Sequence, residues 1–413
     1  MFARWCQEPL RAKLRRPYVH LVFGARQTGK STLLSRLLPP DALRIDLSVP
    51  ATRASYLRDP DQLLAQCRSL PRRGKPYVFI DEAQAVPALF DAVQHLYDSD
   101  KGRWRFVLCG SSARRLRRSG ANLLPGRSFL HRLYPLTTSE RPPDPAPAPH
   151  APSPLPFPWP RGRQPARRFP AVDLETRLAF GDLPGIATAP EGARDELLRA
   201  YAAVHLEEEI RREATIKDVP AFLRFLRLAA LESGQMLNCQ AISRDAGVSQ
   251  PAVKAHYQLL DDMFVGFLVP AFAHSARRRV LSTPRFFMFD LGLRHAAAAL
   301  RATRDTVRAN PGPLFEQLVG IELWKRLQYL GTGQLYYQRT KDGAEVDFIV
   351  EVPTGLYPVE VKWTEHPTSS DARHLLTFLR EHPQRARRGF VVCRCPLPMQ
   401  LHEQVTAIPW SCL

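Results

Sequence analysis

A glycine-rich loop near the amino terminus constrains this chain more than any other feature. The segment GARQTGKST contains the full pattern GxxxxGK[ST], directly after an apolar run and directly before the helical pattern STLLSRLL. Glycines in such a loop let backbone N–H groups turn toward phosphates, and the helix N-terminus adds the positive end of its dipole. We expect the loop to cradle the phosphates of a nucleotide through Gly24, Ala25, Arg26, Gln27, Thr28, Gly29, Lys30, Ser31 and Thr32.

Two acidic residues follow a second apolar run, YVFI, and complete the expected nucleotide site. Lys30 would reach the β- and γ-phosphates of ATP, and Ser31 would ligate Mg²⁺. Asp81 would hold the same Mg²⁺ ion through water, while Glu82, one residue further out, would polarise the attacking water as a general base. Adjacent acids after a strand also occur as solvated turns, so this assignment depends on the glycine-rich loop.

A third apolar run, RFVLCG, ends before two serines and is followed by arginines. The hydroxyl of Ser111 would lie beside the γ-phosphate and sense its presence. Arg114 and Arg127 are both candidates for an arginine that reaches the γ-phosphate of a neighbouring subunit, where it would stabilise transition-state charge. Either could instead be a solvated surface arginine, and an oligomer follows only if one of them acts in trans.

The apolar runs repeat with a regular spacing over the first third of the chain. Runs of five or six residues alternate with longer helical patterns, which predicts a parallel sheet with crossover helices in a P-loop α/β domain. The expected strands are residues 18–23, 43–47, 77–82, 105–110 and 129–136. The pattern stops at Glu140, so we place the first domain at residues 1–140.

These motifs resemble those of prokaryotic AAA-type ATPases of the archaeal kind. The resemblance is carried by GARQTGKSTLL, VFIDEAQ, LCGSSARRL and the later PGR and YPLTTSE. It implies that these residues are Walker A, Walker B, sensor 1 and an arginine before the lid. It extends to LAFGDLP, which resembles the family's glycine-proline motif after the ATPase domain. It also extends to PRFFMFDLGLRH and the region of Glu316, which resemble the family's C-terminal domain of unknown function.

A proline-rich segment separates the first domain from the rest. Ten of the nineteen residues from Pro142 to Pro160 are proline, which favours an extended segment over a packed element. It departs from the family pattern, and we expect a linker or insertion at 141–170. Helical patterns then occupy 171–275, and an α+β region fills 276–413.

The helical middle contains a pattern typical of a helix-turn-helix. A helix at 240–246, a turn at Gly247 and a helix starting after Ser249 have the required spacing. Lys254 and His256 would then be available for phosphate contacts. Winged-helix units also serve as packing modules, so DNA contact and protein packing both stay open.

The carboxyl-terminal region places acids and a lysine on two neighbouring strands. Asp347 lies on the first strand of a predicted hairpin, and Glu360 and Lys362 share a face of the second. Metal-dependent nucleases use this arrangement, with carboxylates on Mg²⁺ and a lysine that orients water. Glu316, on the preceding helix, would add a carboxylate. The region resembles the restriction-endonuclease-like core, although the same charges also occur on solvated edge strands.

Charge and cysteine content narrow the partners and the compartment. The net charge of +18 favours a polyanion such as DNA, but a GC-rich coding sequence would produce a similar excess of arginine. Seven scattered cysteines show no zinc spacing, and no apolar stretch reaches the length of a membrane span. We therefore expect a cytoplasmic protein with free thiols.

Two function classes remain. In the first, an ATPase couples its nucleotide state to DNA binding or processing by the carboxyl-terminal region. In the second, an ATP-dependent switch binds a protein or nucleic acid and cuts nothing. The residues that keep the first class open are Asp347, Glu360 and Lys362.

Overall fold

The computed structural model contains two compact units that we describe separately. It describes residues 2, 4–71, 73–111, 124–146, 168–212, 216, 218–273, 282–339 and 344–413. The N-terminal unit spans residues 4–134 together with 262–264, and the C-terminal unit contains residues 1–3, 135–261 and 265–413. Among the described residues, no helix is long and apolar enough to cross a bilayer.

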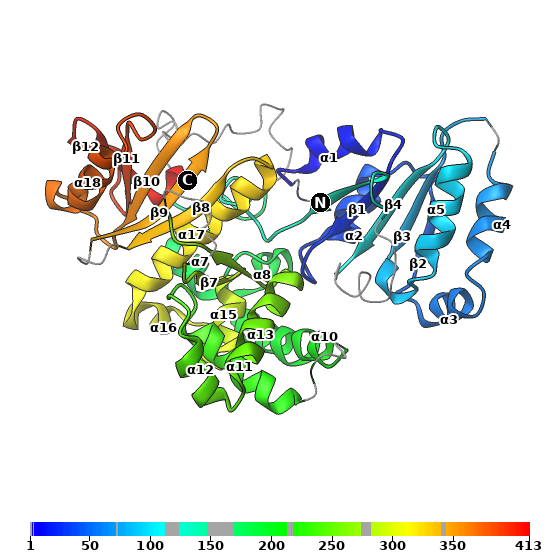
Figure 1. Ribbon diagram of the computed structural model, residues 1–413, viewed down its shortest axis with the longest axis horizontal. Helices are drawn as coiled ribbons and strands as arrows, with labels where there is room; N and C mark the ends of the chain where they lie inside the picture. Colours follow the sequence, from blue (N-terminus) through cyan, green and yellow to red (C-terminus); the bar gives the residue numbers. More distant parts are fainter. Residues whose placement is uncertain are drawn as a thin grey trace. The chain divides into compact units, whose positions relative to one another are not determined.

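A five-stranded parallel sheet forms the centre of the N-terminal unit (Figure 1). Its order is β2-β3-β4-β1-β5, and the strands are β1 (Val19–Phe23), β2 (Leu43–Asp46), β3 (Tyr77–Asp81), β4 (Arg105–Gly110) and β5 (Ser128–Arg132). All five strands coincide with the predicted apolar runs. The prediction of a parallel α/β sheet is therefore confirmed.

Helices cover both faces of this sheet because each carries an apolar stripe toward it. On one face α1 (Gln7–Leu14) and α2 (Lys30–Leu37) bury leucines against Val22, Phe79 and Val107. On the other side of the sheet lies α5 (Leu89–Ser99), with α4 (Gln62–Ser69) beside it and α3 (Pro50–Arg58) following β2 (Figure 1).

The first part of the C-terminal unit is mainly helical, as the sequence predicts. Its helices are α7 (Leu174–Phe180), α8 (Pro184–Thr188), α9 (Glu191–Ala200), a π-helical turn (Tyr201–Leu206), α10 (Glu207–Arg212), α11 (Val219–Leu231), α12 (Cys239–Ala246), α13 (Gln250–Asp262), α15 (Leu291–Ala297) and α16 (Arg304–Ala309). This part also contains two strands that the sequence analysis does not predict, β6 (Gly266–Val269) and β7 (Arg285–Met288). They pair with each other in antiparallel orientation.

The expected turn between α12 and α13 is present. Gly247 has a φ of 71°, in the left-handed region, and the Ser249 hydroxyl accepts the N–H of Ala252 at the start of α13. The half-buried ring of His256 packs against Phe222 and Phe225, and burial lowers its pKa. The phosphate contact expected of His256 stays a prediction.

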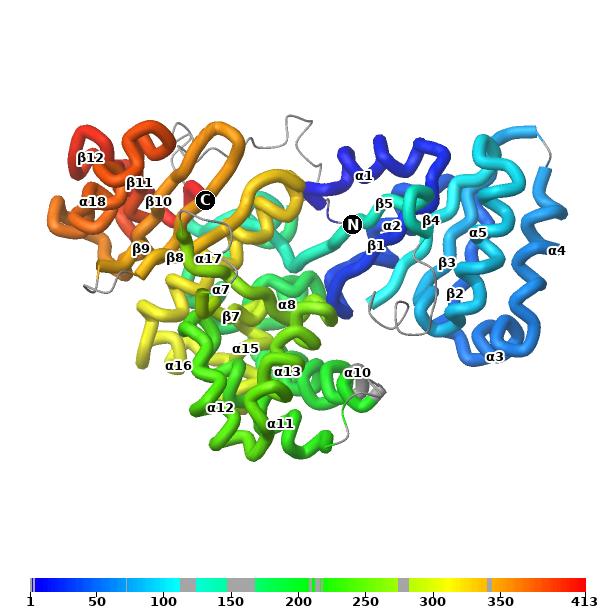
Figure 2. The backbone as a smooth tube through the Cα atoms, viewed as in Figure 1, coloured from blue at the N-terminus to red at the C-terminus, as the bar shows by residue number. Residues whose placement is uncertain are grey.

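The last part of the chain forms a six-stranded mixed sheet of order β12-β13-β11-β10-β9-β8. The strands are β8 (Gln334–Arg339), β9 (Glu345–Val352), β10 (Gly355–Val361), β11 (Gly389–Cys393), β12 (Met399–His402) and β13 (Val405–Pro409). The long helix α17 (Pro311–Leu330) packs against β8, and α18 (Arg373–Glu381) connects the parallel strands β10 and β11 (Figure 2). The predicted hairpin, formed by β9 and β10, and the predicted helix that carries Glu316, α17, are therefore present.

A buried ionic network joins distant parts of the C-terminal unit. Glu322 on α17 is 1% exposed and pairs with Lys325 at 3.0 Å and Arg326 at 2.9 Å. Its carboxylate also accepts the hydroxyl of Thr138 at 2.8 Å, and that hydroxyl lies 2.7 Å from the backbone oxygen of Leu413. The network thus fastens the segment after β5 to α17 and to residue 413.

The described ends of the proline-rich segment pair with each other. The backbone N–H of Asp144 donates to the oxygen of Val172, and that of Val172 donates to the oxygen of Pro142. Beside this contact, Arg141 and Arg177 are buried against Asp182, each at 3.3 Å. Residues 147–167, most of the predicted linker, lie outside the described residues.

Candidate functional sites

The glycine-rich loop connects β1 to α2, where the sequence places it. Gly24 approaches the backbone of the segment after β5 so closely that a Cβ at this position would lie 2.2 Å from the oxygen of Leu133. Gln27 and Gly29 adopt left-handed φ values of 58° and 86°, which turn the chain sharply into the helix. The loop geometry therefore requires glycine at position 24.

Hydrogen bonds within the unit hold the loop in its shape. Thr28 is fully buried, and its hydroxyl donates to the oxygen of Ala25 at 2.9 Å. The Arg4 guanidinium donates to the oxygens of Thr28 and Tyr134, at 2.7 and 2.6 Å, and so ties the loop to the segment after β5. Arg4 has no part in the sequence prediction, since no motif marks it.

Lys30 folds back onto the loop that precedes it. Its Nζ donates to the oxygens of Gly24 and Ala25, both at 2.8 Å, and the side chain is 6% exposed. Ser31 and Thr32 are exposed on the first turn of α2. The ammonium group therefore lies inside the loop, where a phosphate would compete with two backbone oxygens for it.

The strand order brings the predicted acidic residues to the same edge of the sheet. Because β4 pairs with both β1 and β3, the carboxyl ends of all three strands are neighbours. Burial raises the pKa of Glu82, and the nearby charges of Lys30 and Arg26 oppose that rise. Glu82 thus lies within electrostatic reach of the loop.

Gln84 links two of the predicted residues and is missed by the sequence prediction. Its amide nitrogen donates to the Glu82 carboxylate and lies 3.3 Å from the Ser111 hydroxyl. Both Gln84 and Ser111 are almost fully buried. The only signal in the sequence is the position of Gln84 in the turn after β3, three residues beyond Asp81.

The structure does not bring Arg127 into this cluster. Arg127 precedes β5, and its backbone oxygen accepts the N–H of Val19 at the beginning of β1. The side chain pairs with Asp98 at 2.7 Å. It therefore lies at the opposite edge of the sheet, a strand length of about 16 Å from the loop, and only a role toward another copy stays open as a prediction. Arg114, the other candidate, lies outside the described residues.

A second candidate site gathers four carboxylates in the C-terminal unit. Glu316 comes from α17, Glu345 and Asp347 from β9, and Glu360 from β10. Burial raises the pKa of Glu316, Asp347 and Glu360, and the neighbouring carboxylates raise them further.

Two cationic side chains form ion pairs with three of these acids. Arg285 of β7 is 6% exposed and reaches Glu316 at 2.8 Å and also Glu345, while Lys362 contacts Glu360 at 2.7 Å. The sequence prediction contains Asp347, Glu316, Glu360 and Lys362 but misses Arg285 and Glu345. No motif relates Arg285 to the hairpin, and only the packing of β7 brings it there.

The predicted metal ligands are close but are not assembled around one point. Within the described ranges, no three His, Cys, Asp or Glu side chains are arranged to hold a metal ion. Glu316 is turned toward Arg285, and Asp347 accepts the backbone N–H of Val361 at 2.8 Å. One oxygen of Glu360, Oε2, is buried without a hydrogen-bond partner. Glu316 is therefore not a third ligand in this arrangement, whereas Asp347 and Glu360 each keep an oxygen that a cation could use.

Comparisons with known proteins agree with the N-terminal fold. Residues 16–141 match the family described as AAA domain. Residues 171–304 and 311–413 match two domains of unknown function, DUF8612 and DUF4143.

The similar proteins have no assigned function. Uncharacterized proteins of Mycobacterium tuberculosis and Mycobacterium bovis are each 29% identical over 366 residues, covering 87% of this chain and 74% of theirs. One from Haemophilus influenzae is 22% identical, covering 87% of this chain and 86% of its own. A solved structure from Vibrio cholerae covers 95% of this chain and 94% of its own at 13% identity, but its TM-score of 0.19 supports no argument about the fold. The chain therefore carries an AAA domain, which suggests ATP binding, followed by two domains of unknown function.

Proposed function

We propose that the N-terminal unit binds ATP with Mg²⁺ and hydrolyses it. The observation that carries this proposal is the convergence of Lys30, Glu82 and the glycine-rich loop at the carboxyl edge of the sheet. The exposed hydroxyl of Ser31 and the carboxylate of Asp81 are hard oxygen donors of the kind that Mg²⁺ prefers. When bound, the ion would neutralise charge on the phosphates.

Lys30, Glu82 and Gln84 have different roles in the proposed hydrolysis. Lys30 exchanges its bonds to the loop oxygens for bonds to the phosphates. Glu82 accepts a proton from the attacking water, a task suited to a carboxylate whose pKa is raised toward neutrality. Gln84 acts as a positioning residue, because it holds Glu82 beside Ser111.

Two variants separate binding from hydrolysis. Lys30→Ala should weaken ATP binding by about a hundredfold, since a charge-assisted contact to phosphate is lost. Glu82→Gln should leave binding within a few-fold and reduce turnover by about 10²- to 10⁴-fold. Titration with a fluorescent ATP analogue and a phosphate-release assay measure the two effects. Lys101→Ala, an exposed lysine of the same unit, should change neither; equal behaviour of the Lys30 and Glu82 variants would contradict the assigned roles.

As a second function, we propose that the C-terminal unit binds a divalent cation between Asp347 and Glu360 and uses it on nucleic acid. The unpartnered Oε2 of Glu360 favours this proposal, because a buried carboxylate oxygen without a donor is costly unless a cation occupies the site. Two carboxylates with several waters are a usual Mg²⁺ site. Such an ion would activate water and stabilise phosphoryl charge, and Lys362 would orient the water.

The test separates metal binding from cleavage. Mn²⁺ should raise the thermal midpoint of the wild type at pH 8, and Asp347→Ala should remove the effect. Nicking of plasmid DNA or RNA in the presence of Mn²⁺ and ATP, lost in the same variant, would support a nuclease. Metal binding without nicking would favour the alternative, in which nucleotide state controls a switch that binds a partner and cuts nothing.

A further inference from the structure

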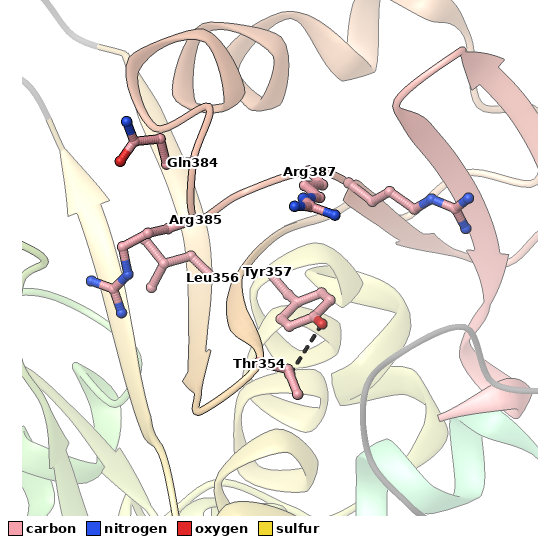
Figure 3. A pocket seen from close by; sticks show the side chains of 7 residues that line it. Thr354, Leu356, Tyr357, Gln384, Arg385 and Arg387 are labelled. Atoms are coloured by element: carbon pink, nitrogen blue, oxygen red, sulfur yellow. Dashed lines mark hydrogen bonds between the residues drawn. The ribbon is translucent and has the colours of Figure 1, made fainter.

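A basic pocket lies on the C-terminal unit, and none of its lining residues belongs to the carboxylate cluster. It opens between the turn of the β9–β10 hairpin and the loop after α18, and its volume is about 390 Å³. The lining includes Thr354, Tyr357, Gln384 and three arginines, Arg385, Arg387 and Arg388 (Figure 3). Its volume falls in the range of roughly 300–1,000 Å³ found for binding pockets of small ligands.

Backbone hydrogen bonds fix the arginine-bearing loop on the hairpin. The N–H of Leu356 donates to the oxygen of Arg385 at 2.8 Å, and Arg385 and Ala386 donate back to His382. Ala386 is 1% exposed and anchors the loop in the core. At Gly355, a Cβ would lie 2.6 Å from the oxygen of Arg385, so the turn and the loop are in direct contact. A ligand would therefore meet a largely preformed site.

The charges in this pocket are not balanced by the protein. Arg385 shares its charge with Glu351 at 2.6 Å. Arg387 and Arg388 are exposed, and within the described part of the chain neither guanidinium has an ion-pair partner. Neighbouring cations repel each other, so an anion that contacts both would relieve that repulsion. Guanidinium groups match phosphate oxygens in a bidentate geometry.

The polar and aromatic groups of the pocket add a second recognition element. The hydroxyls of Thr354 and Tyr357 lie 3.2 Å apart, close to the arginine loop (Figure 3). Tyrosine rings beside arginines are the elements on which nucleic-acid bases and sugars stack while the cations follow the backbone. Tyr357 is also three residues from Glu360 on the same strand, about 10 Å along it.

We infer that this pocket binds phosphate groups of a nucleic-acid strand and that Arg387 and Arg388 are its principal contacts. The exposure of both arginines admits a polymer that extends beyond the pocket, and the net charge of +18 favours a polyanion. The inference extends the second proposed function, because it gives the C-terminal unit a contact for the nucleic acid on which that function would act. Binding of a strand in this pocket does not require cleavage, so this inference and the second proposed function can fail separately.

The test compares two pairs of arginines in the full-length protein. Binding of a fluorescent 20-nucleotide single strand is measured by anisotropy from 50 to 300 mM salt, without ATP or divalent cations. Arg387→Ala/Arg388→Ala should weaken binding by about tenfold and lower the slope of log K against log salt by about 1.4, the value for two lost phosphate contacts on a single strand. Arg58→Ala/Arg68→Ala removes two exposed arginines from α3 and α4 and serves as the matched control.

Each outcome of this experiment either supports the inference or overturns it. It is supported if the pocket pair lowers affinity and slope, if the control pair lowers them much less, and if Arg387→Lys/Arg388→Lys restores the slope while recovering only part of the affinity. An equal loss for both pairs would mean that charge alone binds the strand, and the inference would be lost. Unchanged oligonucleotide binding, with or without a loss of binding to phosphatidylserine vesicles in the pocket pair, would overturn it as well. An unchanged thermal unfolding profile of the full-length protein, which contains both units, shows that the variants are folded.

Discussion

The nucleotide loop and the carboxylate cluster differ in how their charges are held. At the loop, a single lysine lies among backbone groups, and its positive charge is met by carbonyl oxygens of the same segment. At the cluster, four carboxylates from three elements surround two cations, and the pKa values of three of the acids rise. In the first arrangement the ammonium keeps its positive charge, because carbonyl oxygens carry no net charge, and the site suits an incoming anion. The second holds excess negative charge and lowers its energy by taking up protons or a cation.

This difference predicts that the nucleotide site depends mainly on the geometry of its backbone and that the carboxylate cluster depends mainly on the balance of its charges. Changes in loop shape should be severe at the nucleotide site and independent of pH. Changes in charge should dominate at the carboxylate cluster and depend on pH. The predictions that follow test this contrast, beginning with the largest expected effect.

Replacing Gly24 with alanine should have the largest consequence. The new Cβ would meet the backbone oxygen of Leu133, which cannot move aside as a flexible side chain would. We expect a loss of about 4 kcal/mol in the free energy of unfolding of the N-terminal unit and loss of ATP binding. Urea unfolding and nucleotide titration measure both. Gly102→Ala, whose Cβ would meet only Asp100 at 3.8 Å, is the control; equal stability of the two variants would show that the loop tolerates a different shape.

Replacing Arg285 with methionine should destabilise the C-terminal unit in a pH-dependent way. The change leaves Glu316 and Glu345 without their buried partner, and breaking such a pair costs about 3–5 kcal/mol. The loss should be greater at pH 8 than at pH 5, because the pKa of Glu316 is raised to about 7 and this carboxyl binds a proton at the lower pH. Thermal unfolding at both pH values measures it. Arg244→Met removes an exposed pair with Asp245 and should leave the thermal midpoint essentially unchanged. A loss of stability in the Arg285 variant that does not depend on pH would indicate that Arg285 acts through packing and not through its charge.

Replacing Gln84 with methionine should slow turnover without changing ATP affinity. Methionine keeps the length of the side chain but removes the donor that holds Glu82 beside Ser111. We expect about a tenfold lower kcat, since one hydrogen bond to a charged group is lost. That bond also lowers the pKa of Glu82, so its removal should move the acid limb of the kcat profile to higher pH. A lower kcat with an unmoved profile would assign Gln84 a merely structural role.

Replacing Asp347 with asparagine should stabilise the metal-free protein slightly. Burial and Glu360 raise the pKa of Asp347 to about 7, above the value of roughly 3.9 in an unfolded chain. Between these values the folded state binds more protons, so stability falls as the pH rises through this window. The variant lacks this titration and should be more stable than wild type at pH 8 and unchanged near pH 4. Chemical unfolding at both pH values in EDTA checks it, and destabilisation at pH 8 would mean that the carboxylate is already compensated.

The contrast between the sites also explains what the sequence could predict. The nucleotide loop is nine consecutive residues, and local turn and helix geometry determine its shape, so its residues could be identified directly. The parallel strands could be predicted because each is a short apolar run. The roles of Gln84 and Arg285 could not be predicted. Gln84 reaches Glu82 and Ser111 only because of the turn after β3, and Arg285 reaches Glu316 only because β7 pairs with β6. The packing of His256 against Phe222 and Phe225 could not be predicted either, because a partly polar helix does not reveal which aromatic residues lie against it.

The network around Glu322 has a consequence for the order in which the chain can fold during synthesis. The N-terminal unit takes nearly all of its core from residues 4–134, so it can fold once they have left the ribosome. Thr138 can form its hydrogen bond to Glu322 only after 184 further residues have been synthesised, and its hydrogen bond to Leu413 only after 275. During that interval the segment after β5 lacks the residues that later bury it, so Leu136 and Thr138 stay exposed to solvent until α17 and Leu413 have been synthesised.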